Sequence, residues 1–281
     1  MTTREGHVPA PADALSTADK AQIISDARRS RARATLRFRI TSLLTWIALI
    51  GALAASLSGS FDSEFVQTWM PFILGGVEIT VIVSAASVFL AVILAGLGAL
   101  GRLSTHATIY AASTLYVSLV RGTPLLVQII FVYLALPEII PAVARVPTIY
   151  LGIVALAFNY GAYMTEIFRA GIEAVPRGQR EAAEALGMPE SLVMRRIVMP
   201  QAVRIVIPAI GNEFIAMIKD SSLVSVIAVQ ELLWRAQRAG AQSFNTFEAL
   251  AVAALVYWIL TLIFSIIQDR LEKRMARGDR R

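Results

Sequence analysis

The chain has no cysteine, only two histidines and few charged residues. The lack of cysteine excludes disulfide bonds, thiolate metal sites and cysteine nucleophiles. His7 and His106 lie far apart in the sequence, so a histidine metal site is not expected. Charged residues make up 16% of the 281 residues, whereas soluble domains carry about 25%. The composition therefore argues against an ordinary soluble domain, and we expect neither a metal nor another cofactor.

Hydrophobic residues make up 56% of the chain and are concentrated in continuous runs. Such runs are typical of transmembrane helices, whereas the strands of a membrane β-barrel show alternating segments of about ten residues. The sequence contains no phosphate-binding loop of the pattern GxxxxGK(S/T), so ATP hydrolysis by that route is not expected. We therefore predict an all-α, polytopic membrane protein that is not itself an enzyme.

The apolar runs divide the chain into predicted segments. The first run, 40–59, could be a cleaved signal peptide, but its span length and long basic leader favour an uncleaved helix. In 60–71, Phe61, Phe65 and Trp69 recur at four-residue spacing, which predicts a short interfacial helix. The full series is a basic tail (1–39), an extra transmembrane helix (40–59), an interfacial segment (60–71), a domain of five spans (72–268) and a second basic tail (269–281). Within the domain, the five spans are expected at about 72–100, 101–136, 149–168, 205–229 and 248–267, and two of the loops between them at 137–148 and 230–247.

The positive charges predict the orientation of these spans. The net charge of +6 and the pI of about 10.0 would indicate nucleic-acid binding in a soluble protein. Here most Lys and Arg residues flank the apolar runs, in the two tails and in 169–204, while the opposite loops contain Arg145, Arg235 and Arg238. We predict that both termini and 169–204 are cytoplasmic and that no nucleic acid binds. The basic N-terminal tail is either a simple orientation signal or a contact for anionic membrane lipid.

The cytoplasmic segment 175–200 has the features of two short helices joined by a turn. Glu181 to Leu186 is a run of strong helix formers, and Gly187 can adopt the left-handed conformation that ends a helix. Pro189 suits the first turn of the next helix, and the mixed segment that follows is expected to end at Pro200. A helical hairpin beside the membrane is suited to binding a soluble partner, although any loop between spans can contain a short helix.

The spacing in this segment resembles the signature loop of ABC importer permeases. That pattern is Glu-Ala-Ala, three residues, Gly, nine residues, Ile, one residue and Leu-Pro. Here it is formed by Glu181-Ala182-Ala183, Gly187, Ile197 and Met199-Pro200, where methionine replaces leucine at similar volume. Other segments are similar to the polar amino acid (His/Glu/Gln/Arg/opine) permeases: 121–128 (RGTPLLVQ), 161–163 (GAY), 166–169 (EIFR), 178–179 (GQ), 211–214 (GNEF) and 219–223 (KDSSL).

The resemblance covers about 72–270 and implies a particular architecture. The expected fold is the five-helix core of a type I ABC importer, to which the helix at 40–59 is an addition. The implied partners are ABC ATPase subunits, a second permease subunit (identical or related) and an external amino-acid-binding protein, at a bacterial cytoplasmic (inner) membrane. The residues implied to couple to the ATPases are Gly178, Glu181, Ala182, Ala183, Gly187, Ile197 and Pro200, of which Glu181 and Ala182 would lie nearest the partner.

Polar residues inside the predicted spans are candidates for the substrate path, but each also has a structural explanation. Ionisable side chains are expensive in a span, so Glu166 either pairs with Arg169, one turn away, or faces the path. Asn159 lies on the same helical face as Glu166 and could bond either an amino acid or another helix. Tentative path residues are Thr123, Gln128, Asn159, Tyr160, Glu166 and Asn212. The expected structural charges are Arg121, at a broken-helix signal, and Lys219 and Asp220, which would pair with each other or face the partner permease.

Three alternative functions make different demands on the sequence. An ABC permease for another small solute would share the architecture but not the segments at 121–128 and 211–214. An ion channel or proton-coupled carrier would leave the pattern at 175–200 unexplained. An intramembrane enzyme would need a catalytic set that the spans do not contain. The sequence therefore favours an importer permease that moves polar amino acids into the cytoplasm.

Overall fold

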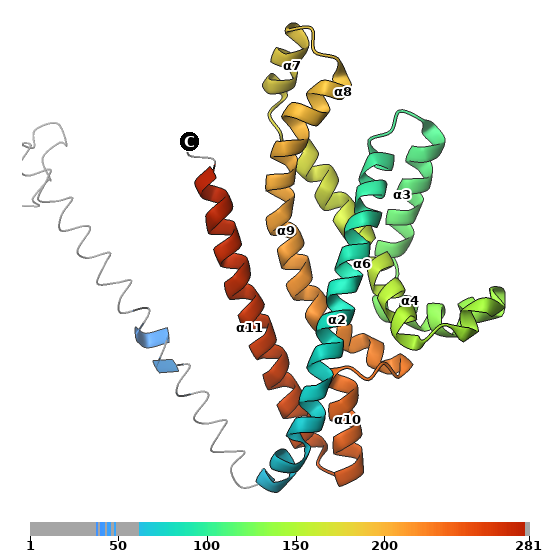
Figure 1. The fold of residues 1–281 in the computed structure, drawn as a ribbon, viewed down its shortest axis with the longest axis vertical. Coiled ribbons are helices and arrows are strands. Elements are labelled where there is room, and N and C mark those ends of the chain that lie inside the picture. Colours follow the sequence, from blue (N-terminus) through green and yellow to red (C-terminus); the bar gives the residue numbers. More distant parts are fainter. Residues whose placement is uncertain (1–37, 39, 43, 46–47, 49–61, 279–281) are drawn as a thin grey trace, which may run out of the picture. The chain divides into compact units, whose positions relative to one another are not determined.

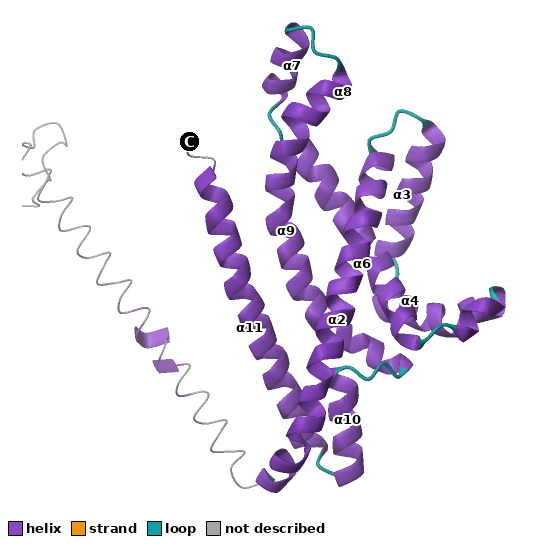
Figure 2. Cartoon of the chain, viewed as in Figure 1, coloured by secondary structure: helices purple, strands orange, loops and turns teal. Residues whose placement is uncertain are grey.

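The computed structural model describes residues 38, 40–42, 44–45, 48 and 62–278, and side chains as far as 275. The predicted basic tail at 1–39, except residue 38, and most of the predicted helix at 40–59 therefore lie outside the described residues. The chain divides into two units, 1–61 and 62–281, and the account below concerns the second. Its described part is built from helices without a strand, as predicted (Figure 2).

Long helices running along the molecule and shorter ones between them make up this unit (Figure 1). The elements, with η marking π- or 3₁₀-helical turns, are α2 (Ser63–Arg102), α3 (Ala107–Arg121), α4 (Leu125–Ile130), η2 (Phe131–Ala135), α5 (Leu136–Ile139), η3 (Pro141–Arg145), α6 (Thr148–Glu173), α7 (Arg177–Ala185), α8 (Glu190–Val193), η4 (Met194–Val198), α9 (Met199–Asp220), η5 (Ser221–Ile227), α10 (Leu232–Ser243) and α11 (Thr246–Gly278).

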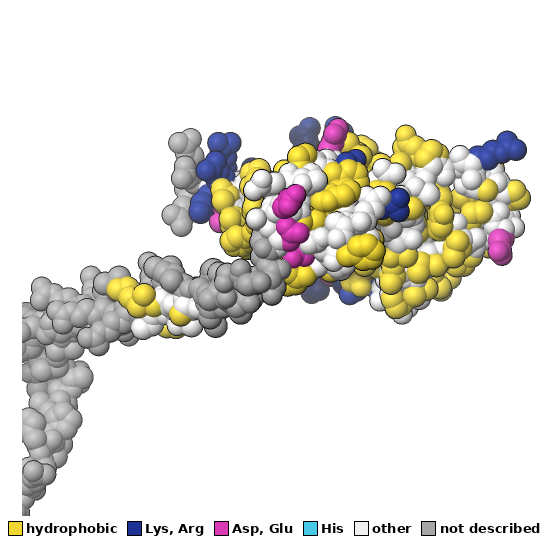
Figure 3. Space-filling model, turned by 90° about the horizontal axis from the view of Figure 1, so that it is seen from below, with side chains coloured by type: hydrophobic (Ala, Val, Ile, Leu, Met, Phe, Trp, Pro, Cys, Tyr) yellow, Lys and Arg dark blue, Asp and Glu magenta, His cyan; other side chains and the backbone are white. Residues whose placement is uncertain are grey.

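Four stretches of the described residues are long and apolar enough to cross a membrane. They are α2, α6, the continuous helical stretch Glu190–Ile227, and α11 up to Met275. A fifth crossing is possible if α3 and the helices that follow it as far as Ile139 form one broken span. Large apolar side chains cover much of the outer surface (Figure 3), as expected where lipid replaces water.

The helix α2 differs from the prediction, because the segment 60–71 is not a separate interfacial helix. Asp62 caps α2 by accepting hydrogen bonds from the backbone N–H groups of Glu64 and Phe65, 2.9 and 3.0 Å away. The helix then continues through Pro71. Phe65 is 4% exposed and packs in a cluster with α10 and α11, and Trp69 packs against the same cluster, so these two aromatic residues take part in helix packing.

The predicted span at 101–136 is sharply bent. The axes of α3 and of the helical stretch Leu125–Ile139 that follows it differ by 105°, and the break falls at Gly122 to Pro124. Proline restricts the preceding residue to extended backbone and removes a hydrogen-bond donor, so the helix ends before it. After the bend, α4, η2, α5 and η3 form an arm that extends sideways from the long helices (Figure 1). The predicted loop at 137–148 is thus partly helical, with prolines in the first turns of α5 and η3.

Three further segments are more helical than predicted. Pro200 does not end a helix: π-helical η4 precedes it, and the N–H of Met199 donates to the carbonyl of Met194 across this wider turn. The wider turn places Pro200 at the start of α9, where its missing donor is tolerated. The predicted loop at 230–247 contains α10, and α11 continues through most of the predicted tail at 269–281.

Two helices approach each other closely at Gly76. A Cβ atom on Gly76 would lie 2.6 Å from the Cα of Leu232, so the start of α10 lies against the backbone of α2. Beside it, the Glu231 carboxylate is fully buried and accepts hydrogen bonds from the Trp234 N–H at 2.8 Å, the Thr80 hydroxyl at 3.3 Å and the Tyr257 hydroxyl. This junction fixes α10 against α2 and α11, at the opposite end of the long helices from α7 and α8 (Figure 1).

Candidate functional site

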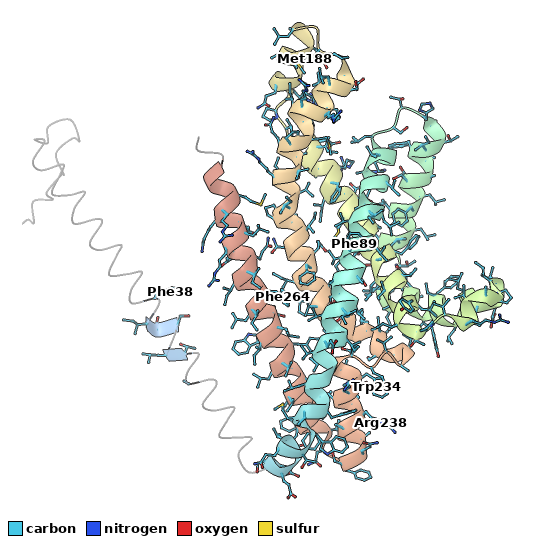
Figure 4. The ribbon with its side chains drawn as sticks, in the orientation of Figure 1. Phe38, Phe89, Met188, Trp234, Arg238 and Phe264 are labelled. Carbon is cyan, nitrogen blue, oxygen red and sulfur yellow. The ribbon has the colours of Figure 1, made fainter. Side chains whose placement is uncertain are left out.

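The coupling hairpin, which we define as α7, the turn at 186–189 and α8, forms one end of the molecule, with Met188 at its tip (Figure 4). Gly187 has φ +75°, as predicted. Its N–H donates to the carbonyl of Glu184 at 2.8 Å, and the Met188 N–H donates to the carbonyl of Ala183 at 3.1 Å. This pair of bonds is a Schellman motif, which ends α7 and fixes the direction of the turn.

The coupling hairpin has its own small apolar core. Ala183 is 3% exposed and packs with Val193, Val198 and the half-buried Ile197. The last residues of α6 share this core, and the Arg180 guanidinium donates to the carbonyl of Ile172 at 2.9 Å. The hairpin is therefore held against the ends of α6 and α9 rather than loosely attached.

The signature residues divide into buried and exposed groups. Ala183 and Ile197 support the hairpin from inside, whereas the outer surface holds Gly178, Glu181, Ala182, Gly187 and Pro200. Sequence reasoning missed Leu186, which is 83% exposed beside the turn. The available signal was a large apolar residue directly before a helix-ending glycine. Leu186 adds an exposed apolar side chain to the surface of the hairpin, as is typical of a protein–protein interaction site.

An ionic cluster lies at the same end of the long helices. The Glu166 carboxylate is 3.3 Å from the Arg102 guanidinium of α2 and 2.8 Å from that of Arg169, which is in turn 2.6 Å from Glu173. Arg102 also donates to the Thr114 hydroxyl of α3 at 2.7 Å. The pairing of Glu166 with Arg169 was expected and the contribution of Arg102 was not. Together these residues join α2, α3 and α6.

Glu166→Gln should lower the stability of the purified protein by about 2 kcal/mol, because it loses the charge-assisted hydrogen bond from Arg169 and the ion pair with Arg102. Glu173→Gln on the same helix is the matched control. The Glu173 side chain is 54% exposed, so its removal should change stability by less than about 0.5 kcal/mol. Thermal unfolding in detergent measures both. Equal effects of the two substitutions would contradict the assignment of Glu166 as the centre of the cluster.

A polar cavity of about 600 Å³ lies where α3, α4, α6 and α9 meet. It brings together three of the predicted path residues, Thr123, Asn159 and Tyr160. Glu166 and Asn212 do not line it, since Glu166 belongs to the ionic cluster and Asn212 is exposed on α9. The remaining lining residues are Arg121, Gly122, Pro124, Leu125, Tyr163, Glu213 and Asp220.

The predicted path residue Gln128 does not line the cavity but joins Thr123 and Asn159 of its wall by hydrogen bonds across the bend. The amide nitrogen of Gln128 donates to the Thr123 hydroxyl at 2.8 Å and to the carbonyl of Val120 at 2.8 Å. The Gln128 oxygen accepts from the Asn159 amide at 3.1 Å. This network ties α4 to α6 and satisfies the carbonyl of Val120 in α3, which lies at the break. Thr123, Gln128 and Asn159 therefore have a structural role in addition to any contact with substrate.

The charged groups of the wall are held by aromatic residues of α6. The Tyr160 hydroxyl donates to the Asp220 carboxylate at 2.7 Å, and the Arg121 guanidinium lies 5.1 Å from the centre of the Tyr163 ring. The predicted pairing of Lys219 with Asp220 does not occur, because adjacent residues of a helix point in different directions. Lys219 is exposed and does not line the cavity. Glu213 also lies in the wall, although it was not among the predicted path residues.

Comparison with known proteins identifies a family whose model matches a region within the described unit. The family model described as "Binding-protein-dependent transport system inner membrane component" matches residues 87–277. The arginine transport system permease protein ArtQ of Bacillus subtilis is 38% identical over 210 residues, which are 75% of this chain and 95% of that protein. The L-cystine transport system permease protein TcyB of the same species is 37% identical, over 75% of this chain and 89% of that protein. A putative glutamine transport system permease protein, GlnP of Rickettsia typhi, is 36% identical, over 73% and 93%.

Solved structures show the same fold. A chain from the crystal structure of an amino acid ABC transporter with histidines superposes with a TM-score of 0.72 at 35% identity, over 76% of this chain and 99% of that one. A chain of the MetNI methionine ABC transporter superposes with a TM-score of 0.63 at 18% identity, over 74% and 98%. The prediction of an all-α importer-permease fold is thereby confirmed.

Proposed function

The chain belongs to the family of binding-protein-dependent transport system inner membrane components, and from this premise we propose that it moves polar amino acids into the cytoplasm as the permease subunit of an ABC importer. It is a transport subunit and not an enzyme. Relatives named for arginine, cystine and glutamine transport support the substrate class. The energy comes from ATP hydrolysed by separate ATPase subunits.

The coupling hairpin is the observation that carries this proposal. It joins an ordered turn at Gly187 to an exposed surface formed by Glu181, Ala182 and Leu186. The whole surface projects beyond the long helices (Figure 1). A projecting helical hairpin with an apolar tip is suited to a cleft in a soluble partner, and an ion channel or proton-coupled carrier has no need of one.

The proposed assembly contains two permease subunits, identical or related, two ATPases and an external amino-acid-binding protein in a bacterial cytoplasmic membrane. Both termini are proposed to be cytoplasmic. In support, the coupling hairpin, the Arg102 end of α2 and the end of α11 lie at one end of the long helices (Figure 1), and Arg238 lies towards the other (Figure 4). Closure of the ATPases would push the hairpin, and α6 and α9 would carry the motion to the cavity.

Co-purification of an ATPase tests the proposal. Tagged protein is isolated in mild detergent from its native membranes, beside Gly187→Arg and Gly187→Asn. We expect an ATPase with a phosphate-binding loop to accompany the wild type. In Gly187→Arg, the new arginine would hold a large side chain in a left-handed conformation that costs about 1–2 kcal/mol. That side chain would also obstruct the partner surface, so the ATPase should be lost.

Gly187→Asn is the matched control, because asparagine tolerates the left-handed conformation and is small. It should retain the ATPase, and both variants should insert into the membrane at wild-type levels. A wild-type protein that is well folded but brings down no ATPase would contradict the importer proposal and favour the carrier or channel.

A further inference from the structure

One face of α11 remains open along most of the helix. Large apolar side chains recur on it at intervals of three or four residues, which keeps them on one side of a helix. Each is about half exposed, and the helix is one of the membrane-spanning stretches, so this face lies against lipid. The residues are Leu255, Ile259, Ile263, Ile266 and Ile267.

Three exposed cations continue the same face where the apolar run ends. They are Arg270, Lys273 and Arg274. Arg270 and Arg274 follow Ile263 and Ile267 by seven residues, which is close to two full helical turns. The uncharged run 249–267 is about 28 Å long, and the hydrocarbon core of a bilayer is about 30 Å thick. The cations therefore begin at the depth of the lipid headgroups.

These cations have no carboxylate partner in the described part of the chain. None lies within 4.0 Å of an acidic oxygen there. Glu272, from the same turn, faces α9 and accepts a hydrogen bond from the Gln268 amide at 2.9 Å, and Gln268 also donates to the carbonyl of Pro208 at 2.8 Å. Asp269 is exposed beside the three cations. The lipid-facing side of this helix end therefore carries an excess of positive charge.

We propose that the cationic end of α11, defined as Arg270, Lys273 and Arg274, binds the headgroup of an anionic phospholipid. The acyl chains of that lipid lie along the exposed apolar face beside it. Cations next to a span attract anionic lipid, and here the charge and the apolar face form one continuous surface. An acidic soluble protein would match the charge but leave the apolar face uncovered. In the proposed orientation the lipid belongs to the cytoplasmic leaflet, and the inference does not depend on which solute is carried.

Quenching of a single fluorophore tests this site. The chain has no cysteine, so one introduced cysteine can be labelled alone. Leu271→Cys places the label among the cations, at a position that is 41% exposed. The full chain is placed in phosphatidylcholine nanodiscs that contain a small fraction of either brominated phosphatidylglycerol or brominated phosphatidylcholine. Each cation near an anionic headgroup raises affinity about fivefold, so phosphatidylglycerol should be enriched at the label at least about tenfold over phosphatidylcholine.

Arg270→Gln combined with Arg274→Gln should lower this enrichment at least about tenfold. The matched control is a label at Leu255→Cys, on the same face and about 24 Å away along the helix. That label should show no preference between the two lipids, with or without the two arginines. Equal quenching by both lipids at Leu271→Cys, or an enrichment that survives the loss of both arginines, overturns the inference. If the double variant loses the co-purifying ATPase while quenching is unchanged, the cations belong to a protein interface and the inference is likewise overturned.

Discussion

Replacing Gly76 with alanine is expected to destabilise the protein by about 3 kcal/mol, the upper range for an overpacked interior. The added Cβ would lie 2.6, 2.7 and 2.8 Å from the Cα and N of Leu232 and the carbonyl carbon of Glu231. All three are backbone atoms, so no side-chain rotation can relieve the clash. The start of α10 must move away from α2, and the apolar cluster that joins α2, α10 and α11 must open with it.

Gly96→Ala on the same helix is the matched control. A Cβ on Gly96 meets no atom within 4 Å, and alanine favours a helix by about 0.5–1 kcal/mol over glycine. The two identical substitutions in α2 should therefore shift thermal unfolding in detergent in opposite directions. If Gly76→Ala unfolds at the wild-type temperature, the close approach of α2 and α10 is wrong.

Glu231→Ala is expected to have the second large effect, a loss of about 3 kcal/mol. The Glu231 side chain is fully buried, and alanine would leave the Trp234 N–H and the Tyr257 hydroxyl without their acceptor. Each buried donor left without a partner costs about 1–3 kcal/mol. Glu231→Gln keeps the shape and an acceptor oxygen, so it should be much milder. Thermal unfolding compares the three proteins, and equal losses for alanine and glutamine would contradict the hydrogen-bonding role.

The same residue predicts how stability depends on pH. Glu231 lies directly before α10, in the sequence between the membrane-spanning stretch that ends at Ile227 and the one that begins at Thr246. Burial raises the pKa of its carboxyl above the ordinary 4.5, although the hydrogen bond from Tyr257 acts to lower it. The folded protein therefore binds this proton more tightly than the unfolded chain. Protonation of Glu231 therefore stabilises the folded protein at pH values below the ordinary pKa of the unfolded chain. This contribution to the free energy of unfolding is lost as pH rises through the raised pKa of the folded protein. Glu231→Gln should remove this decline, and an identical pH profile for the two proteins would contradict it.

These substitutions act at one junction, so their effects should not add. Gly76 and Glu231 are on either side of the contact between α2 and the start of α10. Once Gly76→Ala has separated the two helices, the donors around Glu231 can reach water or new partners. The double variant Gly76→Ala with Glu231→Ala should therefore lose less stability than the sum of the single variants.

Local backbone preference made the coupling hairpin predictable. Gly187 permits the left-handed conformation that ends α7, Pro189 restricts the backbone before α8, and the helix formers before them complete the pattern. The span predicted at 149–168 was also found, as α6, because its apolar run is long and has clear ends. Composition and short-range spacing were enough for both features, and the sequence pattern at 175–200 then indicated the family that the comparisons confirmed.

Contacts between distant parts of the chain were not predictable in the same way. The spacing of Phe65 and Trp69 could not distinguish a membrane interface from the cluster with α10 and α11. Nothing near Glu166 in the sequence indicates Arg102, and nothing near Asp220 indicates Tyr160. The 105° bend was signalled by Gly122 and Pro124, but its size depends on where the arm packs. Charges in spans were recognised as unusual, and only the folded chain separates those that pair from those that line the cavity.

The helical stretch from Glu190 to Ile227 is continuous. It begins in the core of the coupling hairpin, through Val193 and Val198, and its far part carries Glu213 and Asp220. One helical stretch thus takes part in both the coupling hairpin and the cavity. Thermodynamic linkage makes any coupling between binding at these two places reciprocal. If ATPase engagement changes the affinity of the cavity for an amino acid, the bound amino acid changes the affinity of the ATPase by the same factor. Under that condition, the nucleotide-hydrolysing subunits would sense from the cytoplasm whether the cavity holds an amino acid.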